Sequence, residues 1–173
     1  MSAKKATKTA NAGRSAKAPE APQGETKKQG LTKVLFQLEV VDGYPPVAVE
    51  SVWAKELADG TCQLKNIPFF AALVSFDDVV SVKRKGQERF FKKLVRGSGH
   101  STLRVILQKA TSAKALGAAL TKLGCSWEGN TPKHLAIDVP PEAPLEPVQV
   151  LLAAGERAGK WEYEESALQH AEQ

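Results

Sequence analysis

The chain has 173 residues, enough for one domain or two small ones, and a formal net charge of +5 at pH 7. Residues 1–30 contain seven basic and two acidic side chains, so this segment carries the whole excess and residues 31–173 are net neutral. A basic segment on a neutral body predicts weak, salt-dependent binding of polyanions through that segment, and it argues against a nucleic-acid footprint spread over a whole domain.

The sequence shows no segment suited to cross a membrane. The longest apolar run, "IPFFAALVSF" at 67–76, is too short to span a bilayer and is interrupted by Pro68. The N-terminus lacks the apolar stretch of a secretory signal. Cys62 and Cys125 form no C-x-x-C pair, and two cysteines are few for a small secreted fold. We therefore expect a cytoplasmic protein with reduced thiols and no membrane partner.

In chain order, the first part is a segment that we expect to be disordered. Residues 1–30 contain only Met1 from the set of Leu, Ile, Val, Phe and Met. Nothing in this segment can offset the entropy lost when the backbone becomes ordered.

The next part, residues 31–97, is rich in short strand patterns. Those patterns are "KVLFQLEVV", "VAVESVWAKEL", "TCQLKNI", "DVVSVKRK" and "ERFFKKLVR". In the second of them, Val47, Val49 and Trp53 are expected to share one face. Five short strands joined by short turns predict a strongly bent antiparallel sheet or a small barrel.

The last part, residues 98–173, alternates strands with helices. Strand patterns occur in "STLRVIL", "HLAIDV" and "KWEYEE", and helix patterns lie between them, the first capped by Ser112 and Gly124. The order β-α-β-α-β predicts a ferredoxin-like half, so the expected fold class is α+β. We expect Trp161 to pack against Val148 and Leu152.

The stretch "RGSGHSTLRV", residues 96–105, lies where the two halves meet. Its glycines favour a joint between modules, and such joints often border ligand clefts. The candidate ligand-binding residues at this junction are Arg96, Ser98, His100, Thr102 and Arg104, together with Asp42 and Tyr44 of the turn at 42–46.

The same stretch is a poor match to catalytic motifs. The glycine-flanked Ser98 precedes a strand, whereas a nucleophile elbow leads into a helix, and a phosphate loop would need a lysine and a following helix. No catalytic residue is predicted. An enzyme built around His100 stays open as a third alternative, and it would need a carboxylate such as Asp42 beside that ring.

The hairpin at 83–96 combines basic and aromatic residues, and it has two interpretations. It could be an edge hairpin, with lysines that discourage pairing with other chains and with at least one phenylalanine in the core. It could instead be a stacking platform for single-stranded nucleic acid, which requires an exposed ring. The residues in question are Lys83, Arg84, Lys85, Arg89, Lys92, Lys93, Phe90 and Phe91.

No metal or cofactor site is predicted. The three histidines, His100, His134 and His170, form no H-x-x-H motif, and the sequence contains no C-x-x-C motif.

Several short motifs together resemble a known family. They are "VLFQLE", "DGYPPVAVESVWA", "NIPFF", "SGHSTLRV", "LGCSWEG", "AIDVPP" and "WEYEE". In this order they are similar to an uncharacterised bacterial domain of unknown function, from about Lys33 to the end of the chain. The resemblance implies a bacterial, cytosolic protein and supplies no activity, cofactor or catalytic residue.

We expect from all this a non-catalytic binding or regulatory module that takes a protein partner or a small ligand at the junction of its halves. The alternative is a nucleic-acid-associated protein that uses the basic segment and the 83–96 hairpin.

Overall fold

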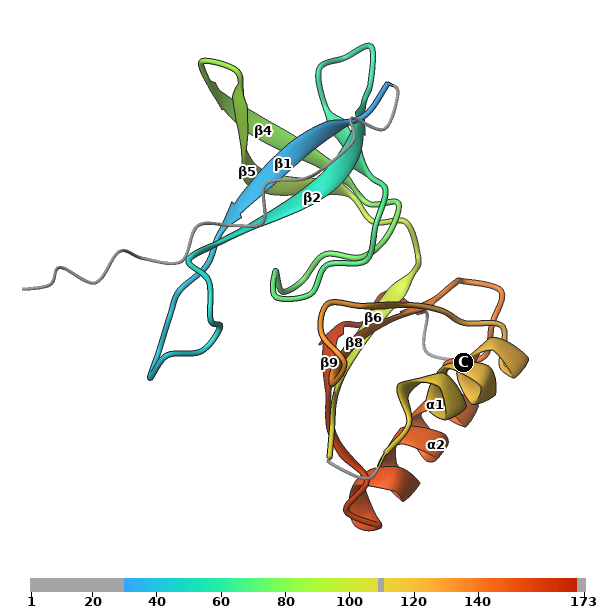
Figure 1. The fold of residues 1–173 in the computed structure, drawn as a ribbon. Helices are drawn as coiled ribbons and strands as arrows, with labels where there is room; N and C mark the ends of the chain where they lie inside the picture. Colours follow the sequence, from blue (N-terminus) through green and yellow to red (C-terminus); the bar gives the residue numbers. More distant parts are fainter. Residues whose placement is uncertain (1–29, 109–110, 171–173) are drawn as a thin grey trace, which may run out of the picture.

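The computed structural model describes residues 30–108 and 111–170. The disorder expected for residues 1–30 therefore concerns residues that lie, apart from Gly30, outside the described ranges. The described chain forms two halves joined by a short linker, with the barrel of the first half above the helices and sheet of the second in Figure 1.

The first half is a closed five-stranded barrel. Each strand pairs antiparallel with the next one along the chain, and β1 pairs with β5 in parallel. The parallel pair follows from the count, since the first and last strands of an odd-numbered meander run in the same direction. The strands are β1 Thr32–Gln37, β2 Val49–Glu56, β3 Cys62–Leu64, β4 Val79–Lys85 and β5 Glu88–Arg96. The predicted strongly bent sheet or small barrel is confirmed.

The buried face of β2 is not the face that carries Val47 and Val49. Val47 and Val49 are exposed, whereas Val52 and Ala54 are fully buried together with the carboxylate-bearing Glu50. Because one of the buried positions holds a glutamate, the positions of the apolar residues alone do not identify the buried face of this strand.

The second half is a four-stranded antiparallel sheet with two helices. The sheet order is β7-β8-β6-β9, and both helices lie on one face of it (Figure 1). The elements are β6 Ser101–Leu107, α1 Ala113–Lys122, β7 Ser126–Gly129, β8 His134–Val139, α2 Leu145–Arg157 and β9 Trp161–Ala167. This β-α-β-β-α-β arrangement confirms the ferredoxin-like prediction, with the four-residue strand β7 as an addition to it.

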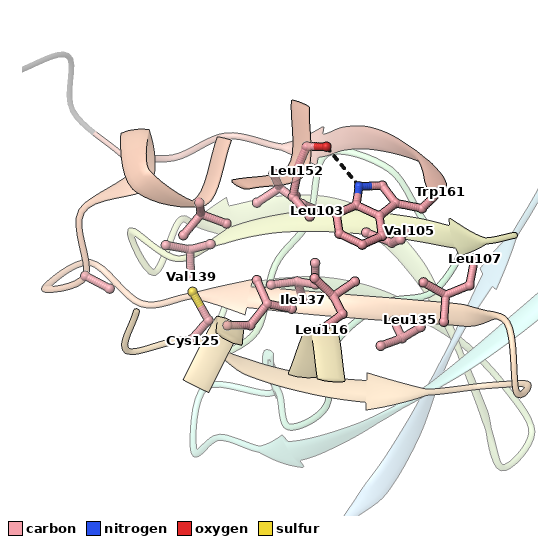
Figure 2. Close-up of a cluster of buried hydrophobic side chains, with 13 residues drawn as sticks. Leu103, Val105, Leu107, Leu116, Cys125, Leu135, Ile137, Val139, Leu152 and Trp161 are labelled. Atoms are coloured by element: carbon pink, nitrogen blue, oxygen red, sulfur yellow. Dashed lines mark hydrogen bonds between the residues drawn. The ribbon is translucent and has the colours of Figure 1, made fainter. Parts of the chain in front are cut away.

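Both helices meet the sheet through a glycine and a tryptophan. A Cβ atom on Gly117 of α1 would lie 2.1 Å from the Trp127 ring, and one on Gly155 of α2 would lie 1.8 Å from the Trp161 ring. Only a residue without a side chain allows the rings to pack so closely against the helix backbone. Trp161 also donates a hydrogen bond from Nε1 to the carbonyl of Leu152, at 2.8 Å, inside the apolar cluster of Figure 2. The expected packing of Trp161 with Leu152 is confirmed.

Candidate functional site

The segment between β3 and β4, residues 67–78, connects the two halves. It lies on the face of the four-stranded sheet that carries no helix, because its polar groups meet the side chains of β6 on that face. Thr102 donates from Oγ1 to Ser75 Oγ at 2.9 Å, and Arg104 donates from Nη2 to the carbonyl of Ala71. As a result β8 is buried on both of its faces.

A buried carboxylate on β2 holds residues 67–78, which we call the docking segment, in place. Glu50 accepts hydrogen bonds from the backbone N–H groups of Phe69, Phe70 and Ala71, at 2.6, 2.9 and 2.6 Å. Three consecutive N–H groups that would otherwise be unpaired therefore bind one side chain from the barrel. The inward position of Glu50 thus has a structural reason.

The glycine-rich linker is also fixed by a buried carboxylate. Asp78 accepts from the backbone N–H of Ser98 at 2.8 Å and from the side-chain amide of Gln169 at 2.8 and 3.1 Å. Ser98 donates from Oγ to the carbonyl of Phe76 at 2.7 Å. The glycines of this linker predict a joint between the two halves. In the structure, however, the hydrogen bonds of Ser98 to Asp78 and Phe76 hold the linker against the barrel half.

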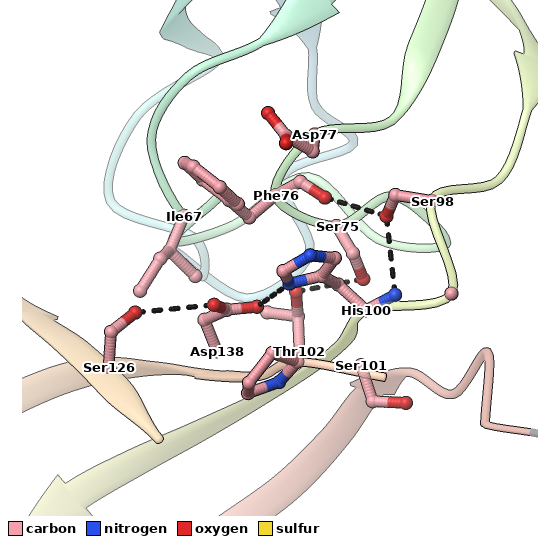
Figure 3. A network of polar contacts seen from close by, with 12 residues as sticks. Ile67, Ser75, Phe76, Asp77, Ser98, His100, Ser101, Thr102, Ser126 and Asp138 are labelled. Carbon is pink, nitrogen blue, oxygen red and sulfur yellow. Dashed lines mark hydrogen bonds and ion pairs between the residues drawn. The ribbon is translucent and has the colours of Figure 1, made fainter. Parts of the chain in front are cut away.

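His100 pairs with a carboxylate, as Figure 3 shows. Its Nδ1 lies 2.7 Å from Asp138 Oδ1, and Asp138 Oδ2 accepts from Ser126 Oγ at 3.2 Å. The enzyme alternative required a carboxylate such as Asp42 beside His100; the carboxylate found there is Asp138, whereas Asp42 lies in the exposed Asp42-Gly43 turn of the barrel. Burial raises the pKa of Asp138, and the hydrogen bond from His100 opposes that rise.

This histidine–aspartate pair lacks a nucleophile in the described part of the chain. Ser101 Oγ contacts His170 Nδ1 at 2.7 Å, and Ser98 Oγ faces the carbonyl of Phe76. None of the described hydroxyl groups hydrogen-bonds to the His100 ring. The pair therefore links the residue before β6 to β8 at the junction, and the described residues supply no hydroxyl as the third member of a triad.

A cavity of about 250 Å³ lies beside the docking segment, between the two halves. One wall is Tyr44, from the arm at residues 38–48 that joins β1 to β2 and reaches down from the barrel (Figure 1). The other walls come from the helix-free face of the sheet. Its lining residues are Tyr44, Arg104, Ile106, His134, Glu162, Tyr163 and Glu164.

Two lining side chains of this junction cavity are buried and incompletely paired. Arg104 is 5% exposed and donates from Nη1 to Glu164 at 2.8 Å, but its Nε has no hydrogen-bond partner among the described residues. His134 is 6% exposed and lies between the rings of Phe69 and Phe70, and its Nε2 also lacks a partner within the described ranges. Buried polar nitrogens of this kind are uncommon in folded proteins.

Burial sets the protonation states around the cavity. It lowers the pKa of His134, with a further contribution from the Arg104 charge, so the imidazole is neutral at pH 7. It raises the pKa of Tyr44, as does the nearby Glu164, so the phenol keeps its proton. The cavity thus combines neutral hydrogen-bonding groups with one guanidinium and two carboxylates.

The structure brings together only some of the residues expected at the ligand site. Tyr44 and Arg104 line the cavity, whereas Ser98, His100 and Thr102 lie in the hydrogen-bonded contact between the halves. The two remaining candidates, Arg96 and Asp42, are exposed, and their side chains form no hydrogen bond or ion pair with another described residue, although Arg96 pairs with Val79 in the β4–β5 ladder.

Sequence reasoning did not find the roles of His134 and Asp138. Both alternate with Leu135 and Ile137 in "HLAIDV", and this alternation indicates only that they lie on the other face of the strand. A histidine and an aspartate at i and i+4 on one face of a strand were a signal, but nothing in the local pattern indicates what covers that face.

The basic hairpin at 83–96 is β4–β5, and its two phenylalanines point in different directions. Phe91 stacks on the core residue Phe36 with ring centroids 4.6 Å apart. The next residue, Phe90, is half-buried on the other side of the strand, opposite Lys83 and Leu35. The expectation that one of the two rings faces the core is confirmed.

The described residues contain neither a cluster suited to a metal ion nor a helix suited to cross a membrane. No group of three or more His, Cys, Asp or Glu side chains could hold a metal ion in the ranges 30–108 and 111–170. Across the same ranges, no helix has both the length and the apolar character needed to cross a bilayer.

Comparisons with known proteins agree with this fold. A crystal structure of a hypothetical protein from Neisseria gonorrhoeae matches with a TM-score of 0.73 and 23% sequence identity, over 81% of this chain and 96% of that one. That likeness shows the fold alone. No curated protein matches the sequence. The family described as "Domain of unknown function (DUF4265)" matches residues 50–163, and the resemblance seen in the motifs is thereby confirmed: the chain belongs to this family.

Proposed function

We propose that the protein is a non-catalytic binding module of the bacterial cytoplasm that takes a small polar ligand in the junction cavity. The observation that carries the proposal is the pair of buried nitrogens, Arg104 Nε and His134 Nε2, that lack partners among the described residues beside a cavity. Leaving such a group unpaired costs about 1–3 kcal/mol each, and a ligand that supplies the missing partners would recover this cost.

The lining suggests what the ligand looks like. The Arg104 guanidinium can donate to a hydrogen-bond acceptor on the ligand, and the carboxylates of Glu162 and Glu164 favour a donor or a positive charge on the ligand. Ligand pockets commonly measure about 300–1,000 Å³, so a cavity of about 250 Å³ suits a molecule at the small end of that range. A small zwitterion, such as a free amino acid, meets all three requirements.

A regulatory role follows from where the cavity lies. Tyr44 belongs to the barrel, whereas Arg104, His134 and Glu164 belong to the sheet. A ligand that contacts both halves stabilises the arrangement in which they meet, in proportion to its affinity for that arrangement. The free, buried Cys62 and Cys125 accord with a reducing compartment.

The test is a cavity-filling variant. Ile106 is 37% exposed and lines the cavity, so Ile106→Trp fills the space without removing a hydrogen bond. The matched control is Val95→Trp, at an exposed apolar position on β5 that does not line the cavity. Native mass spectrometry of the purified proteins, and thermal shifts with the common amino acids, succinate and inorganic phosphate, measure binding.

We expect the wild type and Val95→Trp either to carry a bound small molecule or to be stabilised by at least one of these probes, and Ile106→Trp to show neither. Equal behaviour of the two tryptophan variants would contradict the proposal. So would the absence of both a bound mass and any probe-dependent shift in the wild type, because the cavity then holds only water.

A further inference from the structure

The barrel carries a further concave site, which shares no lining residue with the junction cavity. It has a volume of about 620 Å³ and is formed by one end of β1 together with the β4–β5 hairpin. We call it the hairpin groove. Its lining residues are Gln37, Lys83, Arg84, Lys85, Phe90, Phe91 and Lys92.

An aromatic ring lies at the centre of this groove. Phe90 pairs with Lys83 of β4 and with Leu35 of β1, so it occupies the middle strand of the three. Cross-strand partners share a face, which places the Lys83 side chain beside the Phe90 ring. Because Phe91 faces the barrel core, the neighbouring Phe90 faces outward, where it is only half-buried.

The charged side chains that line the groove are all basic. Four of its lining residues are basic and none is acidic. Glu56 of β2 pairs with Arg84 and with Arg89, which neutralises part of the hairpin's charge. Lys83, Lys85 and Lys92 form no ion pair with any residue in the described ranges. Glu88 is the cross-strand partner of Lys85, so the groove presents one half-buried ring together with three lysines that form no ion pair in the described ranges.

We infer that the hairpin groove binds single-stranded nucleic acid, with a base stacked on Phe90 and with phosphates against the three lysines. Lysines alone would suit any polyanion, but a flat ring at the centre of the positive site favours a ligand that alternates flat apolar groups with phosphates. An acidic peptide offers the charge without the bases. The inference concerns a different surface from the junction cavity and does not depend on a ligand there.

Binding through this groove should be weak and sensitive to salt. Residues 31–173 are net neutral, so little long-range attraction supports the local contacts. With three or four phosphates neutralised on a single strand, the logarithm of the affinity should fall with the logarithm of the salt concentration with a slope of roughly −2 to −3. The basic residues 1–30 add attraction of their own, and the experiment must separate it from the groove.

Two triple variants of the full-length chain make that separation. The groove variant is Lys83→Gln, Lys85→Gln and Lys92→Gln. The control variant removes the same charge from exposed lysines elsewhere, by Lys114→Gln, Lys122→Gln and Lys133→Gln. Fluorescence anisotropy with a labelled oligothymidylate of about 15 nucleotides measures binding at low salt, after thermal unfolding has shown that both variants fold. We expect the groove variant to lose about tenfold or more in affinity relative to the control variant.

The ring is tested by Phe90→Leu, which keeps an apolar side chain and removes the stacking surface. We expect an affinity loss of about tenfold for the oligothymidylate and none for an abasic strand of the same length. Equal binding by the two lysine variants would overturn the inference, because the attraction then belongs to net charge. Equal effects of Phe90→Leu on the two strands, or competition by polyglutamate as strong as by unlabelled oligothymidylate, would overturn it in favour of a general polyanion surface.

Discussion

The two faces of the four-stranded sheet are covered in opposite ways. The helix-covered face is apolar and closely packed, with Leu103, Val105, Leu135 and Ile137 fully or almost fully buried. The face covered by the barrel's docking segment carries Thr102, Arg104, His134 and Asp138, all buried and polar or charged.

This difference indicates that the two faces of the sheet have different roles. Apolar packing against the helices is the main source of stability in a domain of this size. A buried guanidinium and imidazole with unpaired nitrogens add little stability, and such groups are kept where they bind or position something. We therefore assign stability to the helix-covered face, and the barrel-covered face is the one at which the proposed ligand binding would occur.

The largest expected effect lies on the helix-covered face. Trp161→Ala removes a buried ring and its hydrogen bond to the Leu152 carbonyl, and it should lower the free energy of unfolding by roughly 3–5 kcal/mol. Gly155→Ala alone should cost about 1–3 kcal/mol or more, since its Cβ would overlap the Trp161 ring. Urea denaturation measures both.

The double variant that combines Trp161→Ala with Gly155→Ala tests whether the two residues act through their mutual contact. Once Trp161 is alanine, the Gly155→Ala change should become neutral or stabilising by up to about 1 kcal/mol, because alanine favours a helix more than glycine does. Additive losses in the double variant would mean that the glycine–tryptophan contact does not determine the packing of α2.

A smaller effect is expected where the barrel holds its docking segment. Glu50→Gln places an amide NH₂ group against at least one of the three backbone N–H donors, and it should cost about 1–3 kcal/mol. Glu39→Gln, at an exposed position on the β1–β2 arm, is the matched control and should leave stability unchanged. If the two variants unfold at the same urea concentration, the docking segment does not depend on this carboxylate.

The smallest effect is a pH dependence from His134. Its pKa in the folded protein lies below the ordinary value of 6.5, so the unfolded chain binds a proton first as the pH falls. The stability contribution is complete above that value and is lost as the pH falls toward the folded-state pKa. Between about pH 7.5 and pH 5.5, wild-type stability should therefore fall more than that of His134→Gln. Parallel pH profiles of the two proteins would contradict a buried, neutral His134.

Much of each half was predictable because each contains regular periodic patterns. The alternation in "STLRVIL" and the spacing of Leu116 and Leu120 identified β6 and α1, and Ser112 caps α1 as expected, accepting from the Ala115 N–H at 3.3 Å. The strand β7 was missed because four residues are too few to show an alternation.

The contact between the halves was not predictable in the same way. The docking segment "IPFFAALVSF" has no helix or strand period, so its apolar residues indicated burial without a partner. Glu50 and His134 gain their partners from segments that are distant in sequence, and a single sequence contains no periodic trace of such contacts. Tyr44 and Arg104 could be proposed as ligand-binding residues because they lie in or near polar turns of the sequence. The part of the cavity wall that His134 forms could not be proposed, because it depends on contacts between distant segments.

The most direct test of the account is the free energy of unfolding of Arg104→Met. If the barrel-covered face is kept for binding, Arg104→Met should lower the free energy of unfolding by no more than about 1–3 kcal/mol, since the partner Glu164 is largely exposed and the Ala71 carbonyl is the buried acceptor that loses its donor. The same substitution should abolish ligand binding in the junction cavity. A loss of stability as large as that of Trp161→Ala would contradict the account, because Arg104 would then be part of what holds the fold together.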